Sequence, residues 1–244
     1  PTGDPYVEVF NSKGVVLDGW PKKIEYSLSN SISQPWVFNM KPLTLADLNN
    51  DQFLEIIVNP GPDTKYNLDN NKLFIFNYKG DIINGWPFSI QKIYPLRETA
   101  AESFGLAVGD VNKDGVIEFV FSDIDSRVHV VNKDGIELNG WPKRLSYFGI
   151  NNKVFVSPIL VDVDNNGKED IVVVVAEIAN DVSYIIALDD VGNVINGFPK
   201  NLGIKSSAPS ICSSSKSKDS ALMVGSKSNL ILYNLNNLNN NNWP

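Results

Sequence analysis

The sequence predicts an all-β fold built from repeated four-stranded units, and three observations lead to that prediction. Gly-Trp-Pro, or Gly-Phe-Pro in one copy, recurs four times at intervals of 55 to 66 residues. Each copy follows an apolar run and an Asn- or Asp-containing turn that ends in Gly, which is a β-hairpin signal. An acidic loop directly before an apolar run occurs three times. No segment of useful length shows the period of an amphipathic helix.

The aromatic tripeptides mark the last part of each unit. They stand at residues 19–21, 85–87, 140–142 and 197–199, and the sequence given finishes in Trp243-Pro244. The hairpin turns before them cover residues 10–14, 76–80, 131–135 and 188–192. Because repeats of this size bury their apolar faces only by stacking on one another, we expect the aromatic ring to insert between neighbouring units.

The acidic loops mark the first part of each unit. They cover residues 47–55, 110–118 and 162–170, and the strands that follow are 56–58, 119–121 and 171–175. One unit therefore reads as a strand, an acidic loop, a buried strand, a third strand, a Gly turn and a final strand with Gly-Trp-Pro. Four strands in about 50 residues are typical of a β-propeller blade.

Blade counting gives about four and a half blades in a single propeller domain or segment, 1–244. A half-blade lies at 5–24, and full blades lie at about 36–90, 100–146, 153–203 and 207–244. Because this number does not close a ring neatly, we expect a fragment or partial ring of a larger propeller.

The acidic loops have the ligand spacing of calcium sites. Ca²⁺ prefers about six to eight oxygen ligands, which side chains at loop positions 1, 3, 5 and 9 and a backbone carbonyl at position 7 can supply. The predicted ligands are Asp47, Asn49, Asp51, Phe53 and Glu55; Asp110, Asn112, Asp114, Val116 and Glu118; and Asp162, Asp164, Asn166, Lys168 and Asp170. Each loop offers three carboxylates to its ion. About three bound Ca²⁺ ions would change the formal charge from −7 to −1.

Position 6 of these loops requires a left-handed backbone. Gly115 and Gly167 suit it, whereas Gln52 should cost about 1 kcal/mol there. An EF-hand is excluded because position 12 is Val58, Phe121 or Val173, inside a predicted strand, where an EF-hand needs a bidentate acid.

The last blade lacks the carboxylates of the other three. Alignment of Pro209 with Pro158 places uncharged residues at loop positions 1, 3, 5 and 9, and these are Ser213, Ser215, Ser217 and Ala221. We therefore expect no metal site in that blade.

The pairs Phe104-Gly105, Gly109-Asp110 and Asp114-Gly115, together with the repeat, resemble the FG-GAP/VCBS repeats of integrin-α-type propellers. The Gly-Ala-Pro of that family is absent, and residues 59–62 are the nearest equivalent. The resemblance implies calcium loops between the first and second strands of each blade. It also implies a secreted or cell-surface module, extracellular or periplasmic, for protein–protein interaction or adhesion.

A partner is expected on the face formed by the loops between strands 2 and 3 and between blades. These loops vary in length and composition, and variable loops on a rigid scaffold are the usual place for recognition. Tyr66, Tyr94, Arg97 and Tyr147 are the candidate ligand-binding residues, because Tyr and Arg are favoured interface anchors. The ligand could be a protein or a glycan; a lectin-like propeller and a non-catalytic scaffold of a larger protein remain alternatives.

Other functional classes find little support in the composition. A net charge of −7 disfavours nucleic-acid binding, and the longest apolar run, 171–176, is too short to insert into a membrane. A single cysteine allows no internal disulfide. We expect no enzyme activity and no catalytic residues, because the calcium pattern accounts for the clustered acids and the one histidine, His129, is far from Cys212 in sequence.

Overall fold

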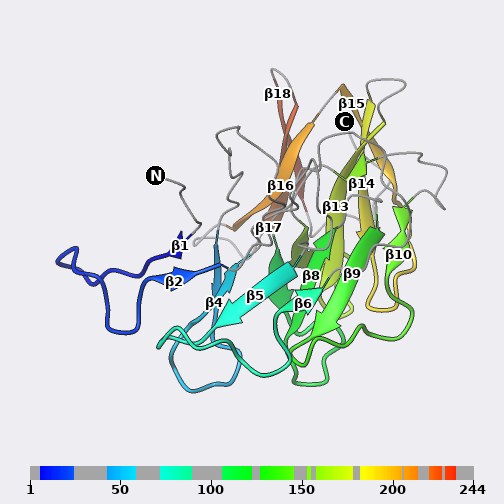
Figure 1. The fold of residues 1–244 in the computed structure, drawn as a ribbon. Coiled ribbons are helices and arrows are strands. Elements are labelled where there is room, and N and C mark those ends of the chain that lie inside the picture. Colours follow the sequence, from blue (N-terminus) through cyan, green and yellow to red (C-terminus); the bar gives the residue numbers. More distant parts are fainter. Residues whose placement is uncertain are drawn as a thin grey trace, which may run out of the picture. The chain divides into compact units, whose positions relative to one another are not determined.

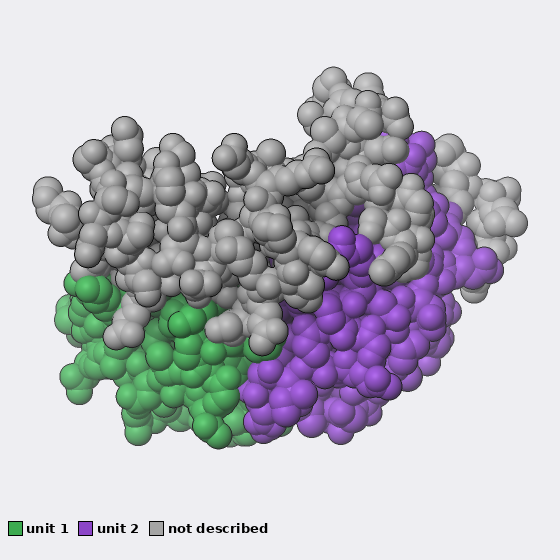
Figure 2. All heavy atoms as spheres, turned by 45° about the vertical axis from the view of Figure 1, so that its right-hand side comes forward, with its two compact units in different colours: residues 1–103 green, residues 104–244 purple. Residues whose placement is uncertain are grey.

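Every named element of the described chain is an antiparallel β-strand (Figure 1). The computed structural model describes residues 6–24, 43–58, 72–89, 106–122, 127–145, 153–154, 158–177, 182–204, 206–213, 220–226 and 229–234. The chain divides into two compact units, Pro1–Ser103 and Phe104–Pro244 (Figure 2). Within the described ranges, no helix has the length and hydropathy needed to cross a membrane.

The first unit contains a two-stranded and a four-stranded sheet. The small sheet pairs β1 (Tyr6–Val7) with β2 (Lys22–Lys23). The larger sheet has the order β3 (Thr44–Ala46), β4 (Glu55–Val58), β5 (Lys72–Phe76) and β6 (Phe88–Ser89). Val7 pairs with Lys22 as Leu73 pairs with Phe88, so β1 and β2 correspond to the last two strands of a blade.

The second unit contains three sheets. The first has the order β7 (Ala107–Gly109), β8 (Glu118–Ser122), β9 (Arg127–Asn132) and β10 (Lys143–Arg144). The second comprises β11 (Lys153–Val154), β12 (Ile159–Val161), β13 (Asp170–Glu177), β14 (Val182–Leu188) and β15 (Lys200–Ile204). Both β11 and β12 pair with β13, so the first strand of this blade is interrupted. The third has β16 (Ser206–Ser213), β17 (Ser220–Ser226) and β18 (Asn229–Asn234).

The core lies between successive sheets. In the second unit, Val128, Val130, Trp141 and Leu145 of one sheet form a buried cluster with residues of the next sheet, Ile171, Val173, Val175, Ile186 and Leu188. In the first unit, Val7, Trp20 and Ile24 form the same kind of cluster with Ile56, Val58, Phe74 and Phe76. The ring of Trp20 meets that of Phe76 edge to face at 5.9 Å. The predicted insertion of the aromatic ring between neighbouring repeats is thus confirmed within each unit.

The four Gly turns share one hydrogen-bond pattern. The side-chain oxygen of Asn11 accepts the backbone N–H groups of Lys13 and Val15 at 2.9 and 3.0 Å. Asn77, Asn132 and Asp189 accept the equivalent pairs in the other turns. An Asn or Asp that caps its own turn in this way mimics a backbone turn, which explains why these residue types recur before the glycine.

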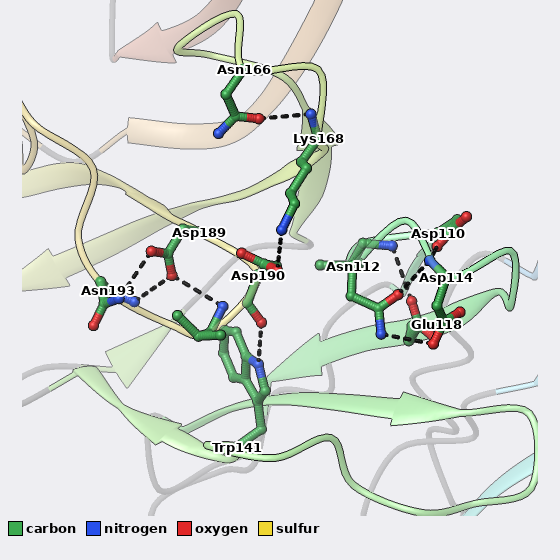
Figure 3. Close-up of polar contacts among 12 residues, drawn as sticks. Asp110, Asn112, Asp114, Glu118, Trp141, Asn166, Lys168, Asp189, Asp190 and Asn193 are labelled. Carbon is green, nitrogen blue, oxygen red and sulfur yellow. Dashed lines mark hydrogen bonds and ion pairs between the residues drawn. The ribbon is translucent and has the colours of Figure 1, made fainter.

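Trp20 and Trp141 are also anchored to the next turn by a hydrogen bond. The indole Nε1–H of Trp20 donates to the Tyr78 carbonyl at 3.2 Å, and that of Trp141 donates to the Asp190 carbonyl at 3.0 Å (Figure 3). Tyr78 and Asp190 each follow the capping residue of their turn. The aromatic–proline peptide bonds of all four tripeptides are cis.

The lysine after the tripeptide lies over the glycine of the following turn. A Cβ atom on Gly80 would be 2.2 Å from Cε of Lys22 and 3.1 Å from the Gly19 carbonyl. On Gly192 it would be 2.5 Å from Cγ of Lys143. Both glycines have φ above +80°, so they meet two requirements at once: a left-handed backbone and close approach of the preceding blade.

We predict that Gly80→Ala destabilises the protein more than Gly14→Ala. Both glycines have positive φ, but a Cβ on Gly14 meets nothing within 4 Å. Gly14→Ala should therefore cost about 1 kcal/mol of backbone strain, and Gly80→Ala about 1–3 kcal/mol more from overpacking. Urea denaturation measures both, and Lys22→Ala should relieve part of the Gly80→Ala loss. Equal losses in the two variants would show that the Lys22 contact is unimportant.

We predict that Trp141→Phe lowers the free energy of unfolding by about 1 kcal/mol through loss of the hydrogen bond to the Asp190 carbonyl. Phe198 occupies this position in the next repeat, so phenylalanine fits the backbone of the tripeptide. Thermal and urea unfolding provide the measurement, with Trp20→Phe as the parallel case in the first unit. A loss above about 3 kcal/mol would mean that the ring volume, rather than the indole N–H, is what matters.

Candidate metal centres

The three acidic loops occupy the predicted place, between the first and second strands of their sheets. They connect β3 with β4, β7 with β8, and β12 with β13. In the first loop, Asp47 accepts the N–H groups of Asp51 and Gln52 at 3.1 and 2.9 Å. The Asp51 carboxylate accepts the N–H of Phe53 at 2.8 Å. These bonds fold the loop around the side-chain oxygens of positions 1, 3 and 5.

The second and third loops repeat this arrangement bond for bond. Asp110 accepts the N–H groups of Asp114 and Gly115 at 3.0 and 2.9 Å (Figure 3), and Asp162 accepts those of Asn166 and Gly167 at 3.1 and 2.8 Å. The position 5 side chain accepts the position 7 N–H at 2.7 Å in both loops. Three segments of different sequence thus adopt one conformation.

Left-handed residues shape each loop at positions 4 and 6. Position 4 has φ of 58°, 62° and 59° at Asn50, Lys113 and Asn165. Position 6 has φ of 84° and 86° at Gly115 and Gly167, and of 73° at Gln52. The predicted left-handed backbone at position 6 is confirmed, including the unfavourable glutamine.

The position 9 acids are buried beneath the loops. Glu55, Glu118 and Asp170 are each 1% exposed. Each accepts the N–H of position 2, from Leu48 at 2.8 Å, Val111 at 3.0 Å and Val163 at 2.7 Å. This bond ties the start of the loop to the second strand, so the acid has a structural role whatever it binds.

Burial and neighbouring carboxylates oppose ionisation of these acids. Burial raises the pKa of Glu118 to about 7, with a smaller contribution from Asp114 and Asp110. Burial likewise raises the pKa of Asp170 to about 7, and it raises the pKa of Glu55. Among the described residues, no Lys or Arg forms a salt bridge with a loop carboxylate. The described part of the chain therefore provides no ion pair that offsets the negative charge of the loops.

In the third loop, carboxylate oxygens of three residues lie close together. Carboxylate oxygens of Asp162, Asp164 and Asp170 all lie within 4.8 Å of one another. Oxygens that share one Ca²⁺ at about 2.3–2.6 Å can be about 5 Å apart at most. Because these donors are all oxygen, the group suits a hard cation such as Ca²⁺ rather than a zinc or copper ion.

The side chain at loop position 7 contacts the Gly turn of its own blade, which sequence reasoning did not foresee. Phe53 stacks on Tyr78 with ring centroids 4.2 Å apart. Lys168 forms an ion pair of 2.7 Å with Asp190 (Figure 3). Tyr78 and Asp190 are the residues whose carbonyls accept the tryptophan bonds. Tyr78 and Asp190 both directly follow the capping Asn or Asp of their turns. This shared place in the repeat is the sequence signal from which the contact could have been predicted.

The other candidate residues divide into two groups. Tyr66, Tyr94, Arg97 and Tyr147, predicted to bind a ligand, lie outside the described residues. His129 is 5% exposed, and its ring stacks on Phe121 at 4.9 Å. Its Nδ1 contacts the Glu137 carboxylate at 2.5 Å. This packing within the sheet gives His129 a structural role.

Comparison with solved structures identifies the class of fold. A crystal structure of BBS1N in complex with ARL6DN, soaked with lead, matches with a TM-score of 0.54 at 12% identity, over 95% of this chain and 59% of that chain. A mercury-soaked crystal of the same complex matches with a TM-score of 0.50 at 12% identity, over 78% and 45%. The chain thus spans about half the length of the chains it matches.

At this identity the likeness concerns the fold alone. It confirms the predicted fold class, since the chain is an all-β propeller built from antiparallel sheets. No family model matches the chain, and no curated protein matches its sequence.

We predict that the metal-free protein loses stability as pH rises from about 5 to 8. A carboxyl with a raised pKa binds its proton more tightly in the folded state, so its contribution favours folding at low pH and is lost as pH rises through about 7. Glu118→Gln retains an acceptor for the Val111 N–H but carries no charge. The metal-free variant should therefore be more stable than wild type by about 1–3 kcal/mol at pH 8.

The measurement is thermal unfolding across this pH range with a chelator present. The advantage of Glu118→Gln should disappear towards pH 5, where Glu118 is protonated. Asp134→Asn, at an exposed turn position, is the matched control and should show no such trend. A constant difference between Glu118→Gln and wild type at all pH values would contradict the prediction.

Proposed function

We propose that this chain is a calcium-binding β-propeller module that binds a protein partner. The observation that carries the calcium assignment is the threefold repetition of one loop conformation around carboxylates without cationic partners. The first loop would hold the ion through Asp47, Asn49, Asp51, Glu55 and the Phe53 carbonyl. The equivalent residues of loops 110–118 and 162–170 would hold two more. When bound, Ca²⁺ would neutralise the charge that burial disfavours in Glu55, Glu118 and Asp170.

The expected energetic effect is moderate. Extracellular calcium modules bind with Kd of about 10⁻⁴–10⁻³ M. At millimolar Ca²⁺, each site then adds about 0.4–1.4 kcal/mol by mass action. Three sites add about 1–4 kcal/mol, against a typical domain stability of about 5–15 kcal/mol. Calcium binding would therefore add to the free energy of unfolding of a propeller that folds without it.

The proposed compartment is one in which calcium sites of this class would be filled. Sites of this strength remain nearly empty at submicromolar Ca²⁺ and fill at millimolar Ca²⁺. We therefore place the module in a secreted, cell-surface or periplasmic setting. The resemblance of residues 104–118 to FG-GAP/VCBS repeats supports the same setting and a role in adhesion.

A protein ligand is the favoured partner. Support comes from the fold neighbours, since BBS1N was crystallised in complex with ARL6DN. The proposed contact residues are the sequence-based candidates Tyr66, Tyr94, Arg97 and Tyr147, which lie outside the described residues. Binding is favoured over catalysis because the clustered carboxylates accept backbone N–H bonds within their loops and the single histidine is packed in a sheet.

A glycan ligand is the second candidate, and one observation favours it. Phe53 and Tyr78 are 50% and 39% exposed although their rings stack. An exposed aromatic pair beside an acidic loop offers both an apolar surface and polar groups to a sugar ring. A glycan array in millimolar Ca²⁺ distinguishes the candidates, because saturable sugar hits lost in Phe53→Ala would favour the lectin-like function.

We predict that the protein binds about three Ca²⁺ ions and melts several degrees higher in millimolar Ca²⁺. Native mass spectrometry or calorimetry gives the stoichiometry, and differential scanning calorimetry gives the melting temperature, with Mg²⁺ as the control. Asp110→Asn combined with Asp114→Asn should remove one ion and about one third of the shift. The matched control, Asp134→Asn, changes an acid outside the loops and should leave three ions bound.

Absence of calcium binding and of any thermal shift would overturn the calcium assignment and remove the main support for an extracellular setting. Retention of all three ions in the double variant would show that calcium binds elsewhere. Either result would leave the propeller fold untouched, since the fold depends on strand pairing and packing.

A further inference from the structure

The second and third acidic loops lie beside each other within the second unit. The strands that lead into them, β7 and β12, are in contact, and a side chain of each loop reaches the backbone of the other. Nζ of Lys113, in the second loop, is 3.2 Å from the place of a Cβ atom on Gly167 of the third loop. In the opposite direction, Oε2 of Glu169 is 2.2 Å from the place of a Cβ atom on Gly109. Glu169, at position 8 of the third loop, therefore lies against the residue that directly precedes the second loop.

Glycine at position 109 is required by space rather than by backbone conformation. Gly109 is paired in β7, and its φ lies outside the left-handed region. A Cβ atom there would be 2.2 Å from the Glu169 carboxylate and 2.7 Å from Cδ1 of Leu160, which are distances that Cβ atoms do not adopt. The first and third loops are preceded by Ala46 and Val161. The missing side chain of Gly109 thus provides the space that the carboxylate of Glu169 occupies.

An acid at position 8 is peculiar to the third loop. The first and second loops have Leu54 and Ile117 there. Glu169 is partly buried, and within the ranges that the structure describes it has no hydrogen-bond or ion-pair partner. Burial raises the pKa of its carboxyl, and the negative charge of Asp110 adds to the increase. An unpartnered acid beside a second acid is unfavourable, and a cation between them would offset that cost.

The second loop has room for a further calcium ligand. Ca²⁺ takes about six to eight oxygen ligands. The loop offers one oxygen from each of positions 1, 3, 5, 7 and 9, and the side chains at four of these positions are drawn in Figure 3. About one to three places around the ion therefore remain for water or for a side chain from outside the loop. Glu169 lies against the start of this loop and brings a carboxylate, which is a ligand that Ca²⁺ prefers.

Given the calcium function proposed above, we propose that Glu169 of the third blade is a further ligand of the ion in the second loop. The ion is then held by two blades and by four carboxylates, which are those of Asp110, Asp114, Glu118 and Glu169. Calcium affinity depends on the number of charged ligands. The second loop is therefore the tightest of the three sites, and its ion stabilises the junction between two blades.

The experiment isolates the second loop in the whole chain. Asp47→Asn with Asp51→Asn, and Asp162→Asn with Asp164→Asn, remove carboxylates from the other two loops but keep acceptors for their N–H groups. Isothermal titration calorimetry with Ca²⁺ then measures the second loop alone. In this background, Glu169→Gln keeps the size of the side chain and removes its charge. It should lower the calcium affinity at least about tenfold.

A matched background tests whether Glu169 acts on its own loop instead. Here the third loop is left intact, and Asp110→Asn and Asp114→Asn replace the two substitutions in the third loop. Glu169→Gln should then leave the calcium affinity unchanged, because position 8 is not a ligand of its own loop. An equal loss of affinity in both backgrounds would contradict the assignment of Glu169 to the second loop. Asp134→Asn, at an exposed turn position, controls for a general loss of negative charge and should leave both affinities unchanged.

Metal-free stability distinguishes a calcium ligand from a residue that only packs. With a chelator at pH 8, Glu169→Gln should melt no lower than its parent, because repulsion by Asp110 is removed. A lower melting temperature with an unchanged calcium affinity would assign Glu169 a packing role and overturn the proposal. Gly109→Ala is the second test should Glu169→Gln disturb folding. Its methyl group displaces the carboxylate, so the affinity of the second loop should fall several-fold.

The two proposals fail in different ways. If the wild-type chain binds no Ca²⁺, both the calcium function and the role of Glu169 are wrong. If the second loop binds Ca²⁺ with the same affinity in Glu169→Gln and Gly109→Ala as in their parent, only the role of Glu169 is wrong. A selective loss of affinity in the second loop supports both.

Discussion

The contact between the aromatic tripeptide of one blade and the Gly turn of the next determines how the sheets of each unit are joined. The tryptophan ring fills the space between two sheets, and its N–H satisfies a turn carbonyl that would otherwise lack a partner. The lysine that follows covers the turn glycine. This arrangement explains three sequence preferences at once: an indole at Trp141, a lysine at 143, and a residue without a Cβ at 192.

The acidic loops are connected to that contact by one residue. Tyr78 accepts the indole bond through its carbonyl and stacks on Phe53 through its ring. Asp190 does the same with Trp141 and Lys168, although its side-chain contact is an ion pair. The position is therefore fixed by the backbone, while the side-chain chemistry varies between blades. One turn residue therefore contacts both the acidic loop of its own blade and the tryptophan of the preceding blade.

Much of this architecture could be predicted from the sequence, because turn chemistry and hydrophobic runs are local signals. The strand order, the place of the acidic loops and the left-handed backbone at Gln52 follow from spacing and residue type. The interruption between β11 and β12 does not, since it depends on how the first strand meets β13. The elevated pKa of Glu118 also required the structure, because burial is its main cause.

The last blade shows that the strands pair into a sheet without the carboxylates of the acidic loops. Between β16 and β17 the carboxylates of the other loops are absent, and yet β16, β17 and β18 pair antiparallel over six residues each. Val224 packs against the preceding sheet with Val172 and Ile185. Blade formation therefore rests on strand pairing and apolar contact, which need no metal. The carboxylates of Glu55, Glu118 and Asp170 are then best understood as an addition to a self-sufficient scaffold. They tie each loop to its strand through the backbone N–H at loop position 2.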